Sequence, residues 1–147
     1  MKHAVYFVVA AALIALCSNI ADAQYRTAPY EVVRYFKGQL DASNVSGMLY
    51  CYWDPEVDAP LQSYNAPRMV ETMETFIQLW KGLSFTLQKQ VVVKGVEVVV
   101  YMYNAETRQL LKFLTNKLSS EWYIKDTEYY FNVDYVGGER LFMFERD

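Results

Sequence analysis

The chain has 147 residues, of which 53% are hydrophobic and 16% aromatic, and its formal net charge is −3. This acidic balance argues against a nucleic-acid binder, which shows a basic excess, and against electrostatic attachment to anionic membranes. The chain has one histidine and two cysteines, which are too few for the usual zinc sites or for a disulfide framework.

Residues 1–23 have the three parts of a secretory signal. Lys2 and His3 form a positive end, residues 4–17 form an apolar run, and Ala21-Asp22-Ala23 is an A-x-A cleavage site. The run of 14 residues is shorter than the roughly 20 that span a bilayer. The sequence therefore predicts an extracellular protein with a single globular domain at residues 24–147 and no membrane span after cleavage. That domain has no histidine and keeps only Cys51.

Three segments have apolar residues at helical spacing. Asn65 is the expected N-cap of the second helix, Pro67 falls in its first turn, and Gly82 is a natural stop. Asn104 is the expected cap of the third, whose stripe would be formed by four leucines at 110, 111, 114 and 118. The predicted helices cover residues 29–40, 67–80 and 105–118.

Strand signals fill much of the rest of the chain, because β-branched and aromatic residues dominate these stretches. Lys94-Gly95 and Gly137-Gly138 each separate two such stretches, which indicates two hairpins. The predicted strands are Met48–Trp53, Phe85–Val93, Val96–Tyr103, Tyr129–Val136 and Glu139–Glu145.

The polarity of these strands predicts their places in a sheet. Met48–Trp53 and Val96–Tyr103 are apolar on both faces, which is typical of central strands. In Phe85–Val93 and Tyr129–Val136, polar and apolar residues alternate, which is typical of strands at the edge of a sheet. We therefore expect an α+β domain with an antiparallel sheet, helices mainly on one face, and the ferredoxin-like split order β-α-β-β-α-β. An N-terminal helix and a C-terminal hairpin strand would be added to it.

Such a sheet leaves a second apolar face to be covered. The N-terminal helix, the partner in a homodimer, or a ligand would each cover it. The alternative fold is a curved, cone-like α+β sheet around a cavity, although the helix expected at 105–118 interrupts the late run of strands that such folds need.

Aromatic side chains are the main candidates for a binding surface, because tyrosine and tryptophan combine apolar area with a polar tip. The tyrosines of the two predicted central strands would join one sheet face. The candidate ligand-binding or partner-binding residues are Tyr50, Tyr52, Trp53, Tyr101, Tyr103, Trp122, Tyr129 and Tyr130.

Few residues are candidates for chemistry. Cys51 lies in a strand that is apolar on both faces, which favours an inert thiol, although a lone cysteine outside the cell also invites an intermolecular disulfide. Asp54, Glu56 and Asp58 lack the spacing of a calcium loop, so we expect a solvated acidic loop and no metal or cofactor. Glu97 is the lone charge on a strand that is otherwise apolar, but it lies beside a turn, so no catalytic residue is predicted.

Asn44-Val45-Ser46 is a glycosylation acceptor in a turn-like setting. With the export signal, it predicts a glycan on Asn44.

These features predict a secreted, non-enzymatic protein that binds an apolar small molecule or an extracellular protein through a tyrosine-rich sheet face or cavity. Two alternatives remain open. One is an extracellular structural protein that self-associates by cross-links through tyrosines and Cys51, and the other is an enzyme that uses carboxylates and tyrosine.

Overall fold

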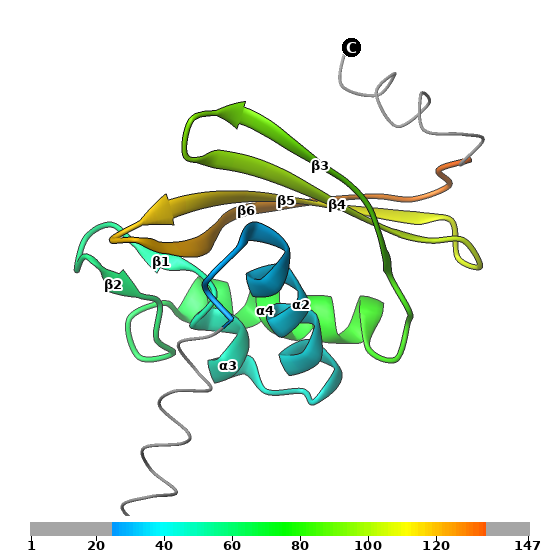
Figure 1. Cartoon of the computed structure of the whole chain (residues 1–147). Coiled ribbons are helices and arrows are strands. Elements are labelled where there is room, and N and C mark those ends of the chain that lie inside the picture. The colour runs from blue at the N-terminus through cyan, green and yellow to red at the C-terminus, as the bar shows by residue number, and fades with distance from the viewer. Residues whose placement is uncertain (1–24, 135–147) are drawn as a thin grey trace, which may run out of the picture.

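The computed structural model describes residues 25–134. The predicted signal at residues 1–23 and the strand at 139–145 lie outside the described residues. The described part is an α+β unit with a two-stranded and a four-stranded sheet, both antiparallel (Figure 1). Its elements are α2 (Pro29–Asp41), α3 (Val45–Leu49), β1 (Trp53–Asp54), β2 (Ala59–Pro60), α4 (Pro67–Trp80), β3 (Thr86–Lys94), β4 (Glu97–Asn104), β5 (Gln109–Leu118) and β6 (Glu121–Tyr130).

The first two predicted helices are confirmed as α2 and α4. In α2 the apolar residues at helical spacing are buried, namely Val32, Val33, Phe36 and Leu40. Helix α4 begins with Pro67. At this position an N–H would have no acceptor within the helix, so its absence in proline costs no hydrogen bond. Its N-cap is Ala66 and not the predicted Asn65, whose side chain bonds to Gln62 and Asp54 instead. Two residues after the helix, Gly82 takes a φ of 78°, which favours glycine and ends the helix.

The first predicted hairpin is confirmed as β3 and β4. They pair in antiparallel register across a turn in which Gly95 has a φ of 51°. As predicted from their polarity, β3 is an edge strand and β4 lies between two neighbours. Among the described helices, none has the length and apolar character needed to cross a membrane.

The helix predicted at residues 105–118 is wrong, because most of this segment forms β5. The Asn104 side chain accepts a hydrogen bond from the Thr107 backbone N–H at 2.9 Å, which closes a turn and caps no helix. The leucines fit a helical stripe, but they also fit a strand buried on both faces. Leu110 packs on one side of the sheet and Leu111 on the other. Pairing with the apolar strand β4 selects the strand period of about 2 residues over the helix period of about 3.6 residues.

The strand predicted at residues 48–53 is also wrong over most of its length. Asn44 caps α3 by accepting a hydrogen bond from the Gly47 N–H at 3.2 Å. Met48 and Leu49 are buried at the end of this short helix, and extended pairing begins only at Tyr52. The local cap therefore outweighs the β propensity of the aromatic run that follows.

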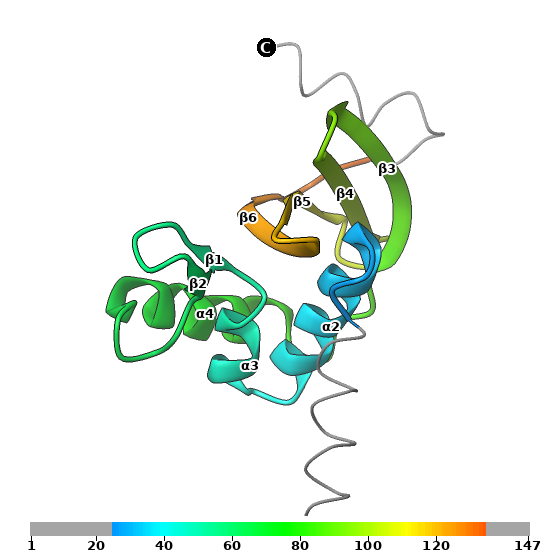
Figure 2. The same ribbon diagram turned by 60° about the vertical axis from the view of Figure 1, so that its left-hand side comes forward.

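The ferredoxin-like split order is not what the chain adopts, since the helix needed between the later strands is absent from that place. The four strands β3-β4-β5-β6 follow one another as a meander. This is the uninterrupted late strand run that the curved-sheet alternative needs. The three helices lie on one side of the sheet, and β1 reaches toward the edge strand β6 (Figure 2).

The main core fills the space between the helices and the inner face of the sheet. Phe36 of α2 is fully buried, and its ring meets Phe113 of β5 at 5.6 Å and Tyr52 at 5.9 Å in edge-on contacts. Such geometry is favoured by the ring quadrupoles. The inner-face residues packed in this core are Val98, Val100, Met102, Leu111, Phe113 and Ile124.

The outer face of the sheet has a second apolar cluster. Tyr101, Tyr103 and Leu110 are buried there together with Val133 from the segment after β6. The Tyr103 hydroxyl donates to the Val133 carbonyl at 2.7 Å. Within residues 25–134, this returning segment covers part of the second face, whereas the N-terminal helix α2, one of the three possible covers, packs in the main core on the other face.

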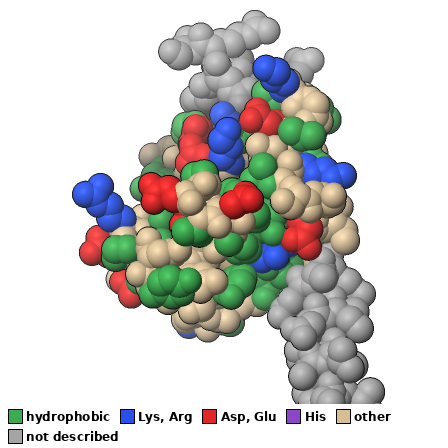
Figure 3. All heavy atoms as spheres, turned by 90° about the vertical axis from the view of Figure 1, so that its left-hand side faces the viewer, with side chains coloured by type: hydrophobic (Ala, Val, Ile, Leu, Met, Phe, Trp, Pro, Cys, Tyr) green, Lys and Arg blue, Asp and Glu red, His purple; other side chains and the backbone are tan. Residues whose placement is uncertain are grey.

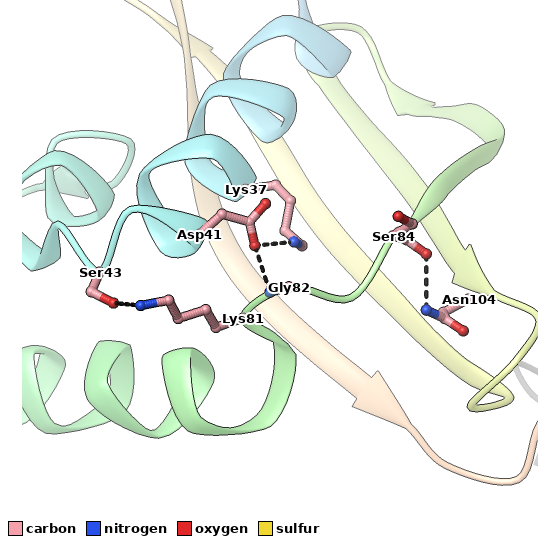
Figure 4. Close-up of polar contacts among 7 residues, drawn as sticks. All are labelled: Lys37, Asp41, Ser43, Lys81, Gly82, Ser84 and Asn104. Carbon is pink, nitrogen blue, oxygen red and sulfur yellow. Dashed lines mark hydrogen bonds and ion pairs between the residues drawn. The ribbon is translucent and has the colours of Figure 1, made fainter.

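Polar contacts fix the connection between the helices and the sheet (Figure 4). The Asp41 carboxylate at the end of α2 accepts from the Gly82 N–H at 3.0 Å, and Lys81 donates to the Ser43 hydroxyl at 2.7 Å. The Asn104 side chain donates to the Ser84 carbonyl at 2.9 Å. The link from α4 to β3 is therefore held at both of its ends.

Candidate functional site

The candidate site lies where β1 meets the edge of β6. The Ile124 N–H donates to the Cys51 carbonyl at 2.7 Å, and Tyr52 pairs with Ile124 in parallel. Since neighbouring residues of a strand point to opposite faces, Trp53 emerges on the outer face when Tyr52 points into the core. A segment of the first half of the chain thereby forms one wall of a site on the last two strands.

A cavity of about 370 Å³ opens at this edge, and we call it the edge cavity. Figure 3 shows this side of the molecule, where hydrophobic side chains gather between acidic ones. Ligand pockets in proteins usually measure about 300–1,000 Å³, so the edge cavity is at the small end of that range. The residues that line it are Trp53, Pro55, Asn116, Leu118, Tyr123, Ile124 and Lys125.

Two aromatic rings form one wall of the edge cavity. The Trp53 and Tyr123 rings have centroids 4.8 Å apart and are tilted by 58°. The Arg26 guanidinium lies 4.7 Å from the centroid of the Tyr123 ring, a cation–π contact that holds this ring in place. Pro55, Leu118 and Ile124 add aliphatic surface.

The Tyr123 hydroxyl is committed to a protein partner. It donates to the Glu121 carboxylate at 2.7 Å. Burial, together with this hydrogen bond, raises the pKa of Tyr123 to about 12. The ring is therefore neutral at physiological pH, and its proton serves Glu121 and not a molecule in the cavity.

Two polar side chains complete the wall. Lys125 forms an ion pair with Glu97 at 3.4 Å, so the predicted lone charge on β4 has a cation beside it. Asn116 lies between Glu97 and Tyr123 in the strand register. Its Oδ1 is buried and accepts no hydrogen bond within the described part of the chain.

A second hollow of about 340 Å³ lies on the outer face of the sheet. Val99 and Leu114 contribute apolar surface to it, and Glu97 and Glu128 contribute carboxylates. The Lys125–Glu97 ion pair joins a wall residue of the edge cavity to a wall residue of this hollow.

The structure places the aromatic residues that were predicted to form a binding surface in different parts of the molecule. Trp53 is the member that lines the edge cavity. Tyr52 is buried in the core, where its hydroxyl meets the Thr127 hydroxyl at 2.6 Å and burial raises its pKa. Trp122 packs against the same core, and Tyr50 is exposed. The expectation that the tyrosines at 50, 52, 101 and 103 share one sheet face is therefore wrong.

The other four predicted tyrosines do not line the edge cavity. Tyr101, Tyr103 and Tyr130 belong to the outer-face cluster, and the Tyr130 hydroxyl donates to Glu128 at 2.6 Å. Tyr129 meets Trp80 of α4 at 5.4 Å, edge to face. The sequence prediction missed Asn116 and Leu118 as site residues, because their proximity to Trp53 depends on strand pairing across about half the chain.

Cys51 and Asn44 occupy contrasting surroundings. The Cys51 sulfur is buried against the Gly47 carbonyl at 3.5 Å, and burial raises the pKa of the thiol. A disulfide to another chain would need this region to open. Asn44 is exposed and donates to the Gln39 side chain at 2.7 Å. Within residues 25–134, no three His, Cys, Asp or Glu side chains come together to hold a metal ion.

No protein-family model, curated protein or solved structure matches the chain. The residues of the edge cavity are therefore the basis for the functional assignment.

Proposed function

We propose that the chain is a secreted, non-enzymatic binding protein that holds an apolar small molecule in the edge cavity. The observation that carries the proposal is the cavity itself, which combines a Trp53–Tyr123 wall with aliphatic surface. Small-molecule sites are typically apolar clefts with a few polar groups that fix orientation. The signal at residues 1–23 supports secretion.

The side chains available for catalysis support the non-enzymatic part of the proposal. The only histidine, His3, lies in the predicted signal. Cys51 is buried with a raised pKa, whereas a nucleophilic thiol needs a lowered one. The Glu97 carboxylate, the lone charge of the strand predicted at 96–103, forms an ion pair with Lys125.

Binding can be tested with the protein recovered from the medium of cells that express the full chain. We expect the dye N-phenyl-1-naphthylamine to gain fluorescence on binding, in a saturable titration. Leu118→Glu places a charge in the apolar wall, so it should weaken binding at least tenfold. Tyr64→Glu is the control, because Tyr64 is 79% exposed and lines neither cavity. No saturable uptake by the wild type, or equal loss in both variants, would contradict the proposal.

A second candidate function is self-association through the edge of β3. Val92, Val93 and Val96 are 69%, 56% and 51% exposed at the tip of the β3–β4 hairpin. An exposed edge strand with apolar side chains is a template for pairing with another chain. Antiparallel pairing of two β3 strands about Gln90 would set Lys89 opposite Val91, so no like charges would meet.

The oligomeric state tests this candidate. Light scattering after size exclusion should show a dimer that Val92→Lys converts to a monomer. Tyr64→Lys is the control, because Tyr64 is 79% exposed and lies outside the hairpin. A wild type that stays monomeric at high concentration would exclude self-association.

A further inference from the structure

We infer that the edge cavity takes a neutral aromatic molecule that carries a hydroxyl or N–H donor, and that the side chain of Asn116 accepts this hydrogen bond. This inference rests on the proposed function and adds the chemical class of the ligand.

Asn116 has an acceptor that the protein leaves unused. Its Oδ1 is buried, with no donor in the described part of the chain. A buried acceptor without a partner loses the hydrogen bonds that water gave it in the unfolded chain. Such groups are uncommon in folded proteins and call for an explanation. Because this oxygen is buried, a donor in the cavity reaches it only if a rotation about the last side-chain bond, whose energy wells are broad, turns it toward the cavity that Asn116 lines.

The side-chain donors of Tyr123 and Lys125, which line the cavity with Asn116, are engaged elsewhere. In the strand register its neighbours are Glu97 and Tyr123. Glu97 is an acceptor, and it pairs with Lys125. The Tyr123 hydroxyl donates to Glu121. A bound molecule is therefore the partner that supplies the missing donor.

The wall of the cavity selects a flat ring. Offset stacking and edge-to-face contacts both place aromatic centroids 4.5–7 Å apart, and the Trp53–Tyr123 pair shows that this wall accepts such a contact at 4.8 Å. A cavity of about 150 Å³ already holds benzene. The edge cavity, at about 370 Å³, has room for two fused rings and little more.

The charges around the cavity favour a neutral ligand. Glu97 and Glu121 lie at its margin through their bonds to Lys125 and Tyr123. They disfavour a carboxylate on the ligand. The Lys125 ammonium is shared with Glu97 and offers an anion little net attraction.

Three matched naphthalenes test the ligand class by displacement of the dye at neutral pH. 2-Naphthol has a donor, 2-methoxynaphthalene keeps the acceptor oxygen without the donor, and 2-methylnaphthalene has neither. We expect 2-naphthol to bind about tenfold more tightly than both others, in line with the typical value of one buried hydrogen bond.

The variant Asn116→Val should abolish this preference while it still binds 2-methylnaphthalene. Gln109→Leu is the matched control, because Gln109 also has a buried, unpartnered side-chain oxygen on β5 but does not line the edge cavity. Its preference for 2-naphthol should equal that of the wild type.

Each outcome with the wild type decides a separate claim, even if a variant fails to fold. Binding of none of the three compounds overturns the proposed function. Equal binding of all three keeps the cavity but overturns the ligand class. If 2-methoxynaphthalene matches 2-naphthol and both exceed 2-methylnaphthalene, the side chain of Asn116 acts as a donor and the inference is wrong.

Discussion

Truncation of Phe113 distinguishes the strand β5 from the helix that the leucine pattern suggests. In the strand, Phe113 points into the main core and is 1% exposed, while Leu114 on the other face is only partly buried. In a helix, Leu114 would lie on the buried stripe and Phe113 beside it. The variants Phe113→Ala and Leu114→Ala therefore rank oppositely under the two structures.

The structure sets the expected magnitude. A buried aromatic side chain covers about 150–250 Å², which at about 25 cal/mol per Å² corresponds to roughly 4–6 kcal/mol of transfer free energy. Measured Phe→Ala losses in cores are about 3–5 kcal/mol, and Phe113 also loses its contact with Phe36. The unfolding free energy of a domain is about 5–15 kcal/mol, so this variant should lose a large fraction of it.

Urea unfolding followed by circular dichroism measures this loss. With a slope of about 1–3 kcal/mol per molar urea, the midpoint for Phe113→Ala should fall by roughly 2 M. Lys117→Ala, at an exposed position of the same strand, should change the free energy of unfolding by about 0.5 kcal/mol or less. A larger loss for Leu114→Ala than for Phe113→Ala would refute the strand assignment.

Three further predictions concern the N-terminal segment, the thiol and the glycosylation site. Arg26 contacts the Tyr25 and Tyr123 rings and donates to the Tyr50 carbonyl at 2.9 Å, so Arg26→Ala should lower the free energy of unfolding by about 1–3 kcal/mol. Arg26→Lys should recover only part of this loss in the same urea assay. Burial raises the pKa of the Cys51 thiol in the folded chain. The contribution of this thiol to the free energy of unfolding is therefore complete below the unfolded thiol pKa of about 8.5, and it falls as the pH rises above that value. Between pH 7 and pH 10, the urea midpoint should fall less steeply with pH for Cys51→Ala than for the wild type. A thiol reagent should label the wild type only after unfolding, and rapid labelling of the native protein would contradict the burial of Cys51. In a eukaryotic host, Asn44→Gln and Ser46→Ala should both remove a glycosidase-sensitive mass. Only Asn44→Gln should also lose about 1 kcal/mol, because it removes the cap of α3; an unchanged wild-type mass after glycosidase would exclude the glycan.

The sequence correctly predicted the elements whose ends or faces are set by nearby residues, such as a proline, a glycine or an apolar run. Pro67 at the first turn of α4 and Gly82 after its end mark that helix from the sequence, and Gly95 marks the β3–β4 turn. The apolar character of residues 96–103 correctly placed β4 inside the sheet. In each case, the constraint lies within a few residues of the chain.

Non-local pairing decided the rest. The leucines of residues 110–118 match two periods, and only contact with β4 selects the strand. The cap at Asn44 turns residues 45–49 into a helix and moves the extended chain to Trp53. The strand predicted at 129–136 is a third error, because β6 covers Glu121–Tyr130 and residues 131–134 form no strand. Because these errors changed the order of elements, the predicted topology was wrong as well.

The same reason limits what the sequence predicted of the site. Trp53 was found as an aromatic residue, but aromatic content alone does not tell a core ring from a cavity wall. Asn116 and Leu118 join Trp53 only through the pairing of β1 with β6 and of β6 with β5. A correct strand register would have been needed to find them.

The most direct test of a ligand in the edge cavity is nuclear magnetic resonance of the labelled protein during a titration with 2-naphthol. Three tryptophan indole signals are expected, from Trp53, Trp80 and Trp122. Trp53 lines the edge cavity, whereas Trp80 is fully buried in the core. We predict saturable shifts of the Trp53 indole and the Asn116 side-chain amide, with the Trp80 indole unchanged. An absence of saturable shifts, or shifts confined to residues outside the edge cavity, would contradict this account.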